Sequence, residues 1–209
     1  MKTIAFTIIL LLLVSIAVVY SKPKDPVLKI NKNKRAPSFT ATDVFGNKIT
    51  LDDFAGKKVF LTFYRNVGCP ICNLRFHEIE SQAGYFKQHD VVVLSVYESS
   101  ASHMKQYLNG DTPFSIMIPD STLALYTHYG VERSTGKLLK GMFHGAMGKM
   151  KKGKKLFTKQ IDQDGNSNRI GADFLIDENG TVLAAHYGKY VGDHLPIQEI
   201  KNLLTQPAH

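Results

Sequence analysis

The chain has 209 residues, of which 44% are hydrophobic and two are cysteine, and its net charge at pH 7 is +8. This length and hydrophobic content suit one well-packed domain and are short for two. A pair of cysteines cannot form a framework of several disulfides, so a disulfide-rich scaffold is excluded.

The positive charge is concentrated in two segments. Residues 22–35 carry a net charge of +5 and the five lysines between Lys149 and Lys155 add another +5, which leaves the rest of the chain about −2. Such basic clusters are typical of solvated segments or segments that face lipid headgroups. Single-stranded nucleic acid also needs aromatic side chains on which its bases stack, and none alternate with these lysines. We therefore expect no nucleic-acid partner.

The amino-terminal segment favours a membrane location. Residues 4–20 contain no charge and are nearly all aliphatic, which is longer than most signal-peptide cores and at the short end of a membrane span. We expect residues 1–21 to be an anchor, with a cleaved signal peptide as the alternative, and residues 22–35 to be a mobile basic linker. The linker lysines favour a cytoplasmic domain, but Lys2 followed by the apolar run favours export, so we expect an extracytoplasmic domain, periplasmic or extracellular.

The folded domain is expected over residues 36–207, beginning with a hairpin around Gly46-Asn47 and a helical turn near residues 51–55. The apolar run 58–64 predicts a buried strand. A helix follows, because apolar residues then recur with a period near 3.6 at Cys72, Phe76, Ile79, Ala83 and Phe86.

The second apolar run, residues 91–96, predicts a strand parallel to the first, since a helix connects the two. Further patterns predict a helix at 102–108, a strand at 113–118, a helix at 120–130, strands at 172–176 and 182–187 around an Asn-Gly turn, and a closing helix at 195–204. This order is typical of a thioredoxin-like α/β fold, with a central mixed sheet flanked by helices.

The stretch between Val131 and Ile170 departs from this alternation. Apolar residues at helical spacing from Leu138 to Met150 run into the lysine cluster, which predicts one basic amphipathic helix within an insert at 137–160. We expect this helix to pack over the edge of the domain. A membrane-surface helix and a lid over the cysteines are the alternatives.

The two cysteines lie where the first buried strand gives way to its helix. Cys69 precedes Pro70, which suits the first helical position, so the Cys69 sulfur should face the unpaired amides of the first turn. The helix dipole then favours its thiolate, and Arg65 could add to this effect. We expect Cys69 to be an exposed nucleophile and Cys72 to be the shielded resolving thiol.

Two other uses of this cysteine pair stay open. It could form an inert disulfide, or it could provide half of a metal site in a non-catalytic metal carrier or redox sensor. Further ligands would then come from His77, His144 or His186, although His77 falls off the Cys72 face of its helix. No second cysteine pair and no close histidine pair accompanies them, so we expect no metal or other cofactor.

An ordered series of motifs resembles the alkyl hydroperoxide reductase and thiol-specific antioxidant family, most closely its peroxiredoxin-like branch. The series is Ala36-Pro37-Ser38-Phe39, Asp43, Gly46, Leu51, Gly56-Lys57, Phe63-Tyr64-Arg65, Cys69-Pro70-Ile71-Cys72, Pro113 to Val131, Asp173 to Asp177, Gly180, His186-Tyr187-Gly188 and Gly192-Asp193-His194. It covers most of residues 36–205.

This resemblance implies a thiol-dependent oxidoreductase that reduces hydroperoxides or protein disulfides with electrons from a thioredoxin-like donor. Cys69 matches the reactive cysteine of the family. Arg169 lies near the position of the family's arginine. In a peroxidase, Asn66, Arg65 or Arg169 would stabilise the leaving oxygen of the peroxide. The sequence lacks the threonine that peroxiredoxins carry three residues before that cysteine, and the cis proline that thioredoxin-like reductases carry before the penultimate strand.

Overall fold

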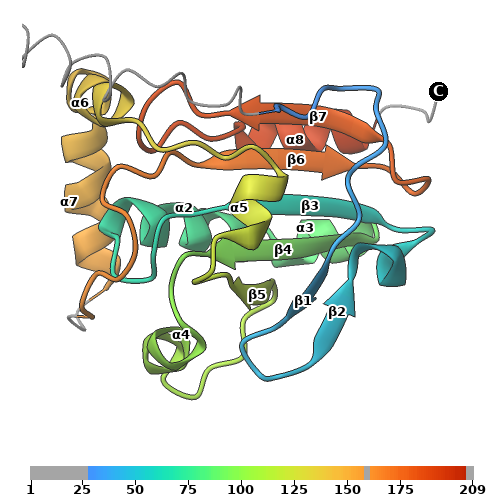
Figure 1. Cartoon of the computed structure of the whole chain (residues 1–209), viewed down its shortest axis with the longest axis horizontal. Helices are drawn as coiled ribbons and strands as arrows, with labels where there is room; N and C mark the ends of the chain where they lie inside the picture. Colours follow the sequence, from blue (N-terminus) through green and yellow to red (C-terminus); the bar gives the residue numbers. More distant parts are fainter. Residues whose placement is uncertain (1–27, 158–160, 206–209) are drawn as a thin grey trace, which may run out of the picture.

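A five-stranded sheet forms the centre of the described part of the chain, residues 28–157 and 161–205 of a computed structural model (Figure 1). The strand order is β5-β4-β3-β6-β7, with bounds Lys58–Phe63 (β3), Val91–Tyr97 (β4), Ile116–Pro119 (β5), Ala172–Ile176 (β6) and Val182–Tyr187 (β7). β3, β4 and β5 are parallel, whereas β6 is antiparallel to β3 and to β7. The predicted mixed sheet is confirmed.

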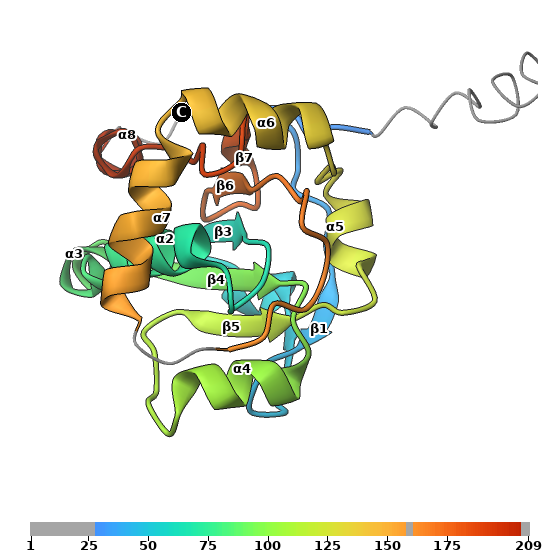
Figure 2. The same ribbon diagram turned by 90° about the vertical axis from the view of Figure 1, so that its left-hand side faces the viewer.

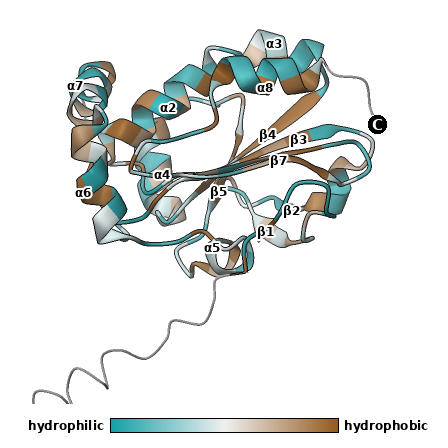
Figure 3. Ribbon diagram, turned by 90° about the horizontal axis from the view of Figure 1, so that it is seen from above, coloured by the Kyte–Doolittle hydropathy of each residue, from teal (hydrophilic) through white to brown (hydrophobic). Residues whose placement is uncertain are grey.

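Both faces of this sheet are covered. Helices α2 (Pro70–Glu80), α3 (Ala83–Gln88) and α8 (Ile197–Leu204) lie on one face; the short helix α5 (Ala124–His128) and the hairpin of β1 (Thr40–Thr42) and β2 (Lys48–Thr50) lie on the other (Figure 3). Phe60 and Phe63 are an odd number of positions apart on β3 and therefore face opposite sides of the sheet. Phe60 joins the cluster under α3 and α8, and Phe63 joins the cluster under α5. A 3-10 turn, Leu51–Phe54, follows β2, and α4 (Ala101–Leu108) lies beside β5 (Figure 2).

Three predicted helices differ from the observed ones. The helix expected from Cys72 to Phe86 is divided into α2 and α3, although most of its apolar face is buried as expected. The helix expected from residue 120 begins at Ala124, because the Asp120 carboxylate accepts hydrogen bonds from the Ala124 and Leu125 amides.

The third difference is the insert, where one amphipathic helix was expected. It forms two helices, α6 (Thr135–Phe143) and α7 (Ala146–Leu156), because Gly145 takes a φ of 81°, in the left-handed region that favours glycine. Helix α7 crosses the start of α2 (Figure 1). Packing over the domain edge is therefore confirmed only for part of the apolar stripe. Ala146 is buried, whereas the exposed apolar side chains are Leu139, Met142, Phe143 and Met147.

The basic linker ends against the domain. Asn33 donates its amide to the Val182 carbonyl at 2.8 Å, and the Val182 amide donates to the Lys34 carbonyl at 2.9 Å. These residues are thus held beside β7, and the expected mobile tether does not extend to residue 35. None of the described helices is long and apolar enough to cross a bilayer. The predicted anchor, residues 4–20, lies outside the described residues.

Asp173 on β6 ties four parts of the fold together. Its carboxylate accepts hydrogen bonds from the Thr62 hydroxyl at 2.6 Å and the Leu195 amide at 2.7 Å, and it lies 3.0 Å from His194 Nδ1. Arg75 on α2 lies 3.9 Å away. Burial alone would raise the pKa of Asp173, but these partners, His194 first, lower it overall. The side chain is therefore an ionised carboxylate that joins β3, β6, α2 and the segment before α8.

We predict that Asp173→Asn destabilises the fold by about 3 kcal/mol, because Arg75 loses a buried counter-charge and the new amide group opposes existing donors. The isosteric Asp111→Asn, at an exposed position, should change stability by less than about 0.5 kcal/mol. Denaturant unfolding of both variants measures the difference. Equal stability of the two variants would contradict a structural role for Asp173.

Candidate active site around Cys69 and Cys72

Cys69 is the N-cap residue of α2, as the sequence predicts. Its backbone is extended, with φ −83° and ψ 114°, and Pro70 occupies the first helical turn. The Cys72 amide points to the Cys69 sulfur, with a nitrogen to sulfur distance of 3.4 Å. Both cysteines are free thiols. The first turn of α2 thus holds two sulfurs together and directs backbone dipoles at one of them.

The two thiols have opposite shifts in pKa. A hydrogen bond from the Cys72 thiol, with the charge of Arg65 and the amides of Cys72 and Ile71, lowers the pKa of Cys69 to about 6 although burial opposes the shift. Burial, followed by proton sharing with Cys69, raises the pKa of Cys72 well above its usual value. At neutral pH Cys69 is therefore a thiolate and Cys72 a thiol.

Arg65 and Asn66 lie just before the cysteines, in the turn that follows β3. Arg65 Nη1 donates to the Ser167 carbonyl at 2.8 Å, and Nη2 donates to the Gln163 side chain. This guanidinium is close enough for its charge to lower the pKa of Cys69. The backbone carbonyl of Asn66 accepts a hydrogen bond from the Cys69 amide at 3.2 Å. The buried side-chain oxygen of Asn66 has no hydrogen-bond partner among the described residues.

The expectation that Cys69 is exposed is wrong. Its exposed fraction is 1%, compared with 7% for Cys72. The cover comes from the insert and the segment after it, because Phe157 and Ile161 pack against the apolar cluster that contains both sulfurs. A Cβ atom on Gly68 would lie 2.7 Å from the Ile161 carbonyl oxygen, so glycine permits this close approach.

Sequence reasoning missed the residues that hold this cover in place. Asp164 accepts hydrogen bonds from the Ser99 hydroxyl at 2.6 Å and the Ser100 amide at 3.0 Å. The Ser99 hydroxyl oxygen in turn accepts from the Val67 amide at 3.0 Å. The loop after β4 therefore links the covering segment to the turn before Cys69. The only sequence signal was the group of polar residues after Tyr97.

Comparison with known proteins identifies the family. The model of the AhpC/TSA family matches residues 33–185. The chain therefore belongs to the AhpC/TSA family.

The relatives of this AhpC/TSA protein carry two kinds of name. A thiol-disulfide oxidoreductase named ResA, from Bacillus cereus, is 31% identical over 134 residues, which cover 60% of this chain and 75% of the relative. A Mycobacterium tuberculosis protein, named as a peroxiredoxin, is 21% identical over 170 residues, which cover 80% of this chain and 91% of the relative. The chain is accordingly an oxidoreductase of the thiol-disulfide oxidoreductase and peroxiredoxin class.

A solved structure confirms the thioredoxin-like fold. The reduced 2-Cys peroxiredoxin of Plasmodium vivax has a TM-score of 0.57 and 18% identity, and the match covers 84% of this chain and 80% of that one. At this identity the likeness concerns the fold alone.

Arg169, which the family resemblance selected, is engaged elsewhere in this AhpC/TSA domain. Its Nε donates to the buried Glu98 carboxylate, and Nη1 donates to the Val131 carbonyl at 2.6 Å. The guanidinium carbon lies 4.5 Å from the centre of the Tyr126 ring. Arg169 is thus a buried cross-link whose charge is paired with Glu98, and its expected role beside the sulfur stays a prediction.

The histidines considered as metal ligands are dispersed. His77 is exposed on α2, His144 stacks on Tyr190 after α6, and His186 lies on β7, 3.5 Å from Asp193. Within residues 28–157 and 161–205, no group of three or more His, Cys, Asp or Glu side chains is placed to hold a metal ion. These residues therefore offer no assembled site for the metal-carrier alternative.

We predict that alkylation of Cys69 by iodoacetamide accelerates as pH rises, with its midpoint at about pH 6, and levels off roughly one pH unit above that midpoint. Cys72→Ala should move this midpoint upward most, because it removes the thiol that donates to Cys69. Arg65→Met should move it upward by less. Rate against pH, with modified Cys69 followed by mass spectrometry, measures all three midpoints.

The matched control is Lys57→Met, which removes a cation at the opposite end of β3. Its midpoint should equal that of the unmodified chain. Coincident midpoints for Cys72→Ala and the unmodified chain would contradict the hydrogen bond between the two sulfurs.

Proposed function

We propose that Cys69 and Cys72 form a redox pair that reduces disulfides, with electrons returned by a thioredoxin-like dithiol donor. The supporting observation is the geometry of the first turn of α2. The Cys69 sulfur accepts a hydrogen bond from the Cys72 amide, with a nitrogen to sulfur distance of 3.4 Å, and the Cys72 thiol in the same turn keeps its proton. A thiolate and a thiol held this close suit attack by the first and resolution by the second.

The reaction then has two balanced steps. The Cys69 thiolate attacks one sulfur of the substrate disulfide, which forms a mixed disulfide and expels the other sulfur as a thiolate. Cys72 loses its proton to that thiolate and attacks the Cys69 sulfur, which forms the Cys69–Cys72 disulfide and releases the second substrate sulfur. The donor dithiol reduces this disulfide and is itself oxidised.

Reduction of hydroperoxides is the second candidate, favoured by the charge of Arg65 near Cys69. Attack on a peroxide would give a Cys69 sulfenic acid and release an alcohol or water, and Cys72 would condense with it to the same disulfide. We place this activity second, because the charge of Arg169 is already paired with the Glu98 carboxylate.

The cover over the sulfurs bears on substrate size. With Cys69 1% exposed, a protein disulfide reaches the sulfur only if Phe157 and Ile161 are displaced locally. Small disulfides and peroxides need less displacement.

We further propose that residues 4–20 anchor the chain in a membrane, with the domain on the extracytoplasmic side.

We predict that Cys69→Ser abolishes turnover of both a small disulfide and hydrogen peroxide. Cys72→Ser should retain the first step and stop there, so a mixed disulfide on Cys69 should accumulate and be visible as a stable added mass. Comparing turnover of the two substrates by the unmodified chain ranks the activities. Undiminished turnover in Cys69→Ser would show that another group is the nucleophile.

A further inference from the structure

Most of the exposed apolar side chains gather on the insert. Of the seven large apolar side chains that are exposed among the described residues, five lie between residues 139 and 156. Phe143 is 88% exposed, and Leu139, Met142 and Met147 are each more than half exposed. Single apolar residues are normal on a protein surface, whereas a cluster of them marks a site of interaction.

Helix α6 packs on the domain through a glycine and turns large apolar side chains outward. Gly141 is buried against Val191, because a Cβ atom on this glycine would overlap with Val191 Cγ1. Leu139 and Phe143 lie two positions on either side of Gly141, so at 3.6 residues per turn they point away from Val191. The usual arrangement, in which the large apolar side chains face the core, is therefore reversed here.

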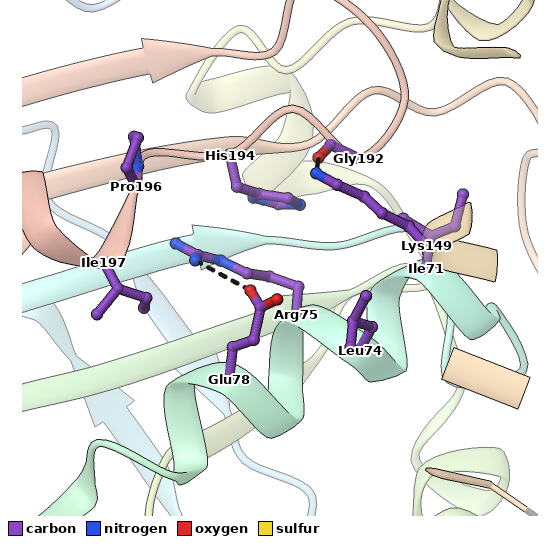
Figure 4. A pocket seen from close by; sticks show the side chains of 9 residues that line it. All are labelled: Ile71, Leu74, Arg75, Glu78, Lys149, Gly192, His194, Pro196 and Ile197. Atoms are coloured by element: carbon purple, nitrogen blue, oxygen red, sulfur yellow. Dashed lines mark hydrogen bonds and ion pairs between the residues drawn. The ribbon is translucent and has the colours of Figure 1, made fainter. Parts of the chain in front are cut away.

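Helix α7 is fastened to the domain in the same way. A Cβ atom on Gly153 would overlap with the Pro70 carbonyl, so this glycine allows the backbones of α7 and α2 to touch. On the same side of α7, the Lys149 ammonium donates to the Gly192 carbonyl at 2.6 Å (Figure 4). These contacts fix which side of α7 faces the solvent.

The solvent side of α7 is basic. Lys151 and Lys155 lie two positions on either side of Gly153, so they point away from Pro70. Residues 133–161 contain nine Lys and Arg residues and no Asp or Glu. Both helices lie at one end of the molecule, at the left in Figure 1, and both cross that end in Figure 2. The outer face of the insert is their combined exposed surface, with Leu139, Lys140, Met142, Phe143, Met147, Lys151, Lys152, Lys154 and Lys155.

This combination of side chains selects the kind of partner. Apolar side chains beside a group of lysines suit the boundary between acyl chains and headgroups of a bilayer, and the lysines favour anionic lipid. A second copy of the chain would bring two such faces together, and their like charges would repel each other. An anionic lipid surface complements both the apolar and the charged part of the outer face.

The start of the described chain lies beside the insert. Lys29 Nζ is 3.7 Å from the carboxylate of Glu132, three residues before α6 begins at Thr135. Nine residues separate Lys29 from Tyr20, the end of the proposed anchor, and a chain of this length spans at most about 30 Å. An anchor at residues 4–20 would therefore keep the insert within reach of the bilayer.

We propose that the outer face of the insert docks on a bilayer that contains anionic lipid, with Phe143 and its apolar neighbours at the acyl boundary and the lysines at the headgroups. This role goes beyond the redox function and does not depend on it. Because Gly153 of α7 touches Pro70, docking would hold the cysteine motif about one helix diameter, roughly 10 Å, from the headgroups.

The test uses the absence of tryptophan from the sequence, since Phe143→Trp then places a single fluorescent reporter in the outer face. The full chain is reconstituted into vesicles of phosphatidylcholine, with or without phosphatidylglycerol. With phosphatidylglycerol, the emission should shift to shorter wavelength and be quenched by brominated acyl chains. Without it, or in high salt, the emission should be that of an exposed indole, because the attraction of the lysines is absent or screened.

The control for the reporter is Phe45→Trp, an exposed phenylalanine in the turn between β1 and β2. Its emission should be the same in both kinds of vesicle. A shift in Phe45→Trp equal to that in Phe143→Trp would overturn the proposal, because the insert would then have no special contact with the lipid.

The role of the lysines is tested in the Phe143→Trp chain. Lys151→Gln combined with Lys155→Gln should lower the ratio of docked to undocked chains about thirtyfold, a factor of about five for each lysine. The matched control, Lys48→Gln combined with Lys105→Gln, removes the same charge from exposed positions on β2 and α4. It should leave the ratio within about twofold, because distant charges are screened. An equal loss in both double variants would overturn the proposal, since net charge alone would then be sufficient.

Two further outcomes separate docking from its alternatives. A chain that stays with anionic vesicles but shows no shift in Phe143→Trp would overturn docking and support the anchor alone. A shift that appears without vesicles and grows with protein concentration would show that a second copy covers the outer face, which would also overturn the proposal. Neither readout involves turnover, so failure of the proposed redox function would leave both unchanged.

Discussion

Two buried sulfurs that share one proton at the start of a helix are the constraint on which the rest of this structure depends. Burial disfavours the ionised form of either thiol. The Cys72 thiol, the charge of Arg65 and the amide of Cys72 all lower the pKa of Cys69, and together they outweigh that cost. Ionisation is therefore confined to one sulfur, and the other retains the proton that the resolving step must later release.

The fold provides this arrangement by ending a central strand at the site. β3 pairs with β4 on one side and β6 on the other, so the turn that carries Cys69 starts from the central strand of the sheet. Helix α2 then packs on the sheet through Phe76 and Ile79. The insert closes the other side, with Gly153 of α7 against Pro70 and Phe157 against the apolar cluster of the cysteines.

Local signals in the sequence were sufficient for the strand, the helix and the N-cap position of Cys69. Pro70 and the apolar run before Gly68 act within a few residues, and such short-range preferences survive in the fold. The hairpin at Asn179-Gly180 was predictable for the same reason. The division of the insert into two helices was not predictable, because the apolar period continues through Gly145 while the helical backbone is interrupted there.

The surroundings of the sulfur depend on contacts that are distant in sequence. The cover over Cys69 comes from residues about ninety positions later, and periodicity gives no register for such a contact. Arg169 was selected by resemblance, but its partner Glu98 is 71 positions away and lies in a stretch that predicts only the end of a strand. The cluster of Arg75, Asp173 and His194 was missed likewise, although two charged residues in otherwise apolar elements were a visible signal.

The most direct test of the central claim is the thiolate ultraviolet absorbance of the reduced chain at neutral pH, measured for the unmodified chain, Cys69→Ser and Cys72→Ser. The account predicts close to one thiolate per chain in the unmodified protein, none in Cys69→Ser, and one in Cys72→Ser, whose hydroxyl can still donate to Cys69. A full thiolate signal that persists in Cys69→Ser, or no signal in the unmodified chain, would contradict it.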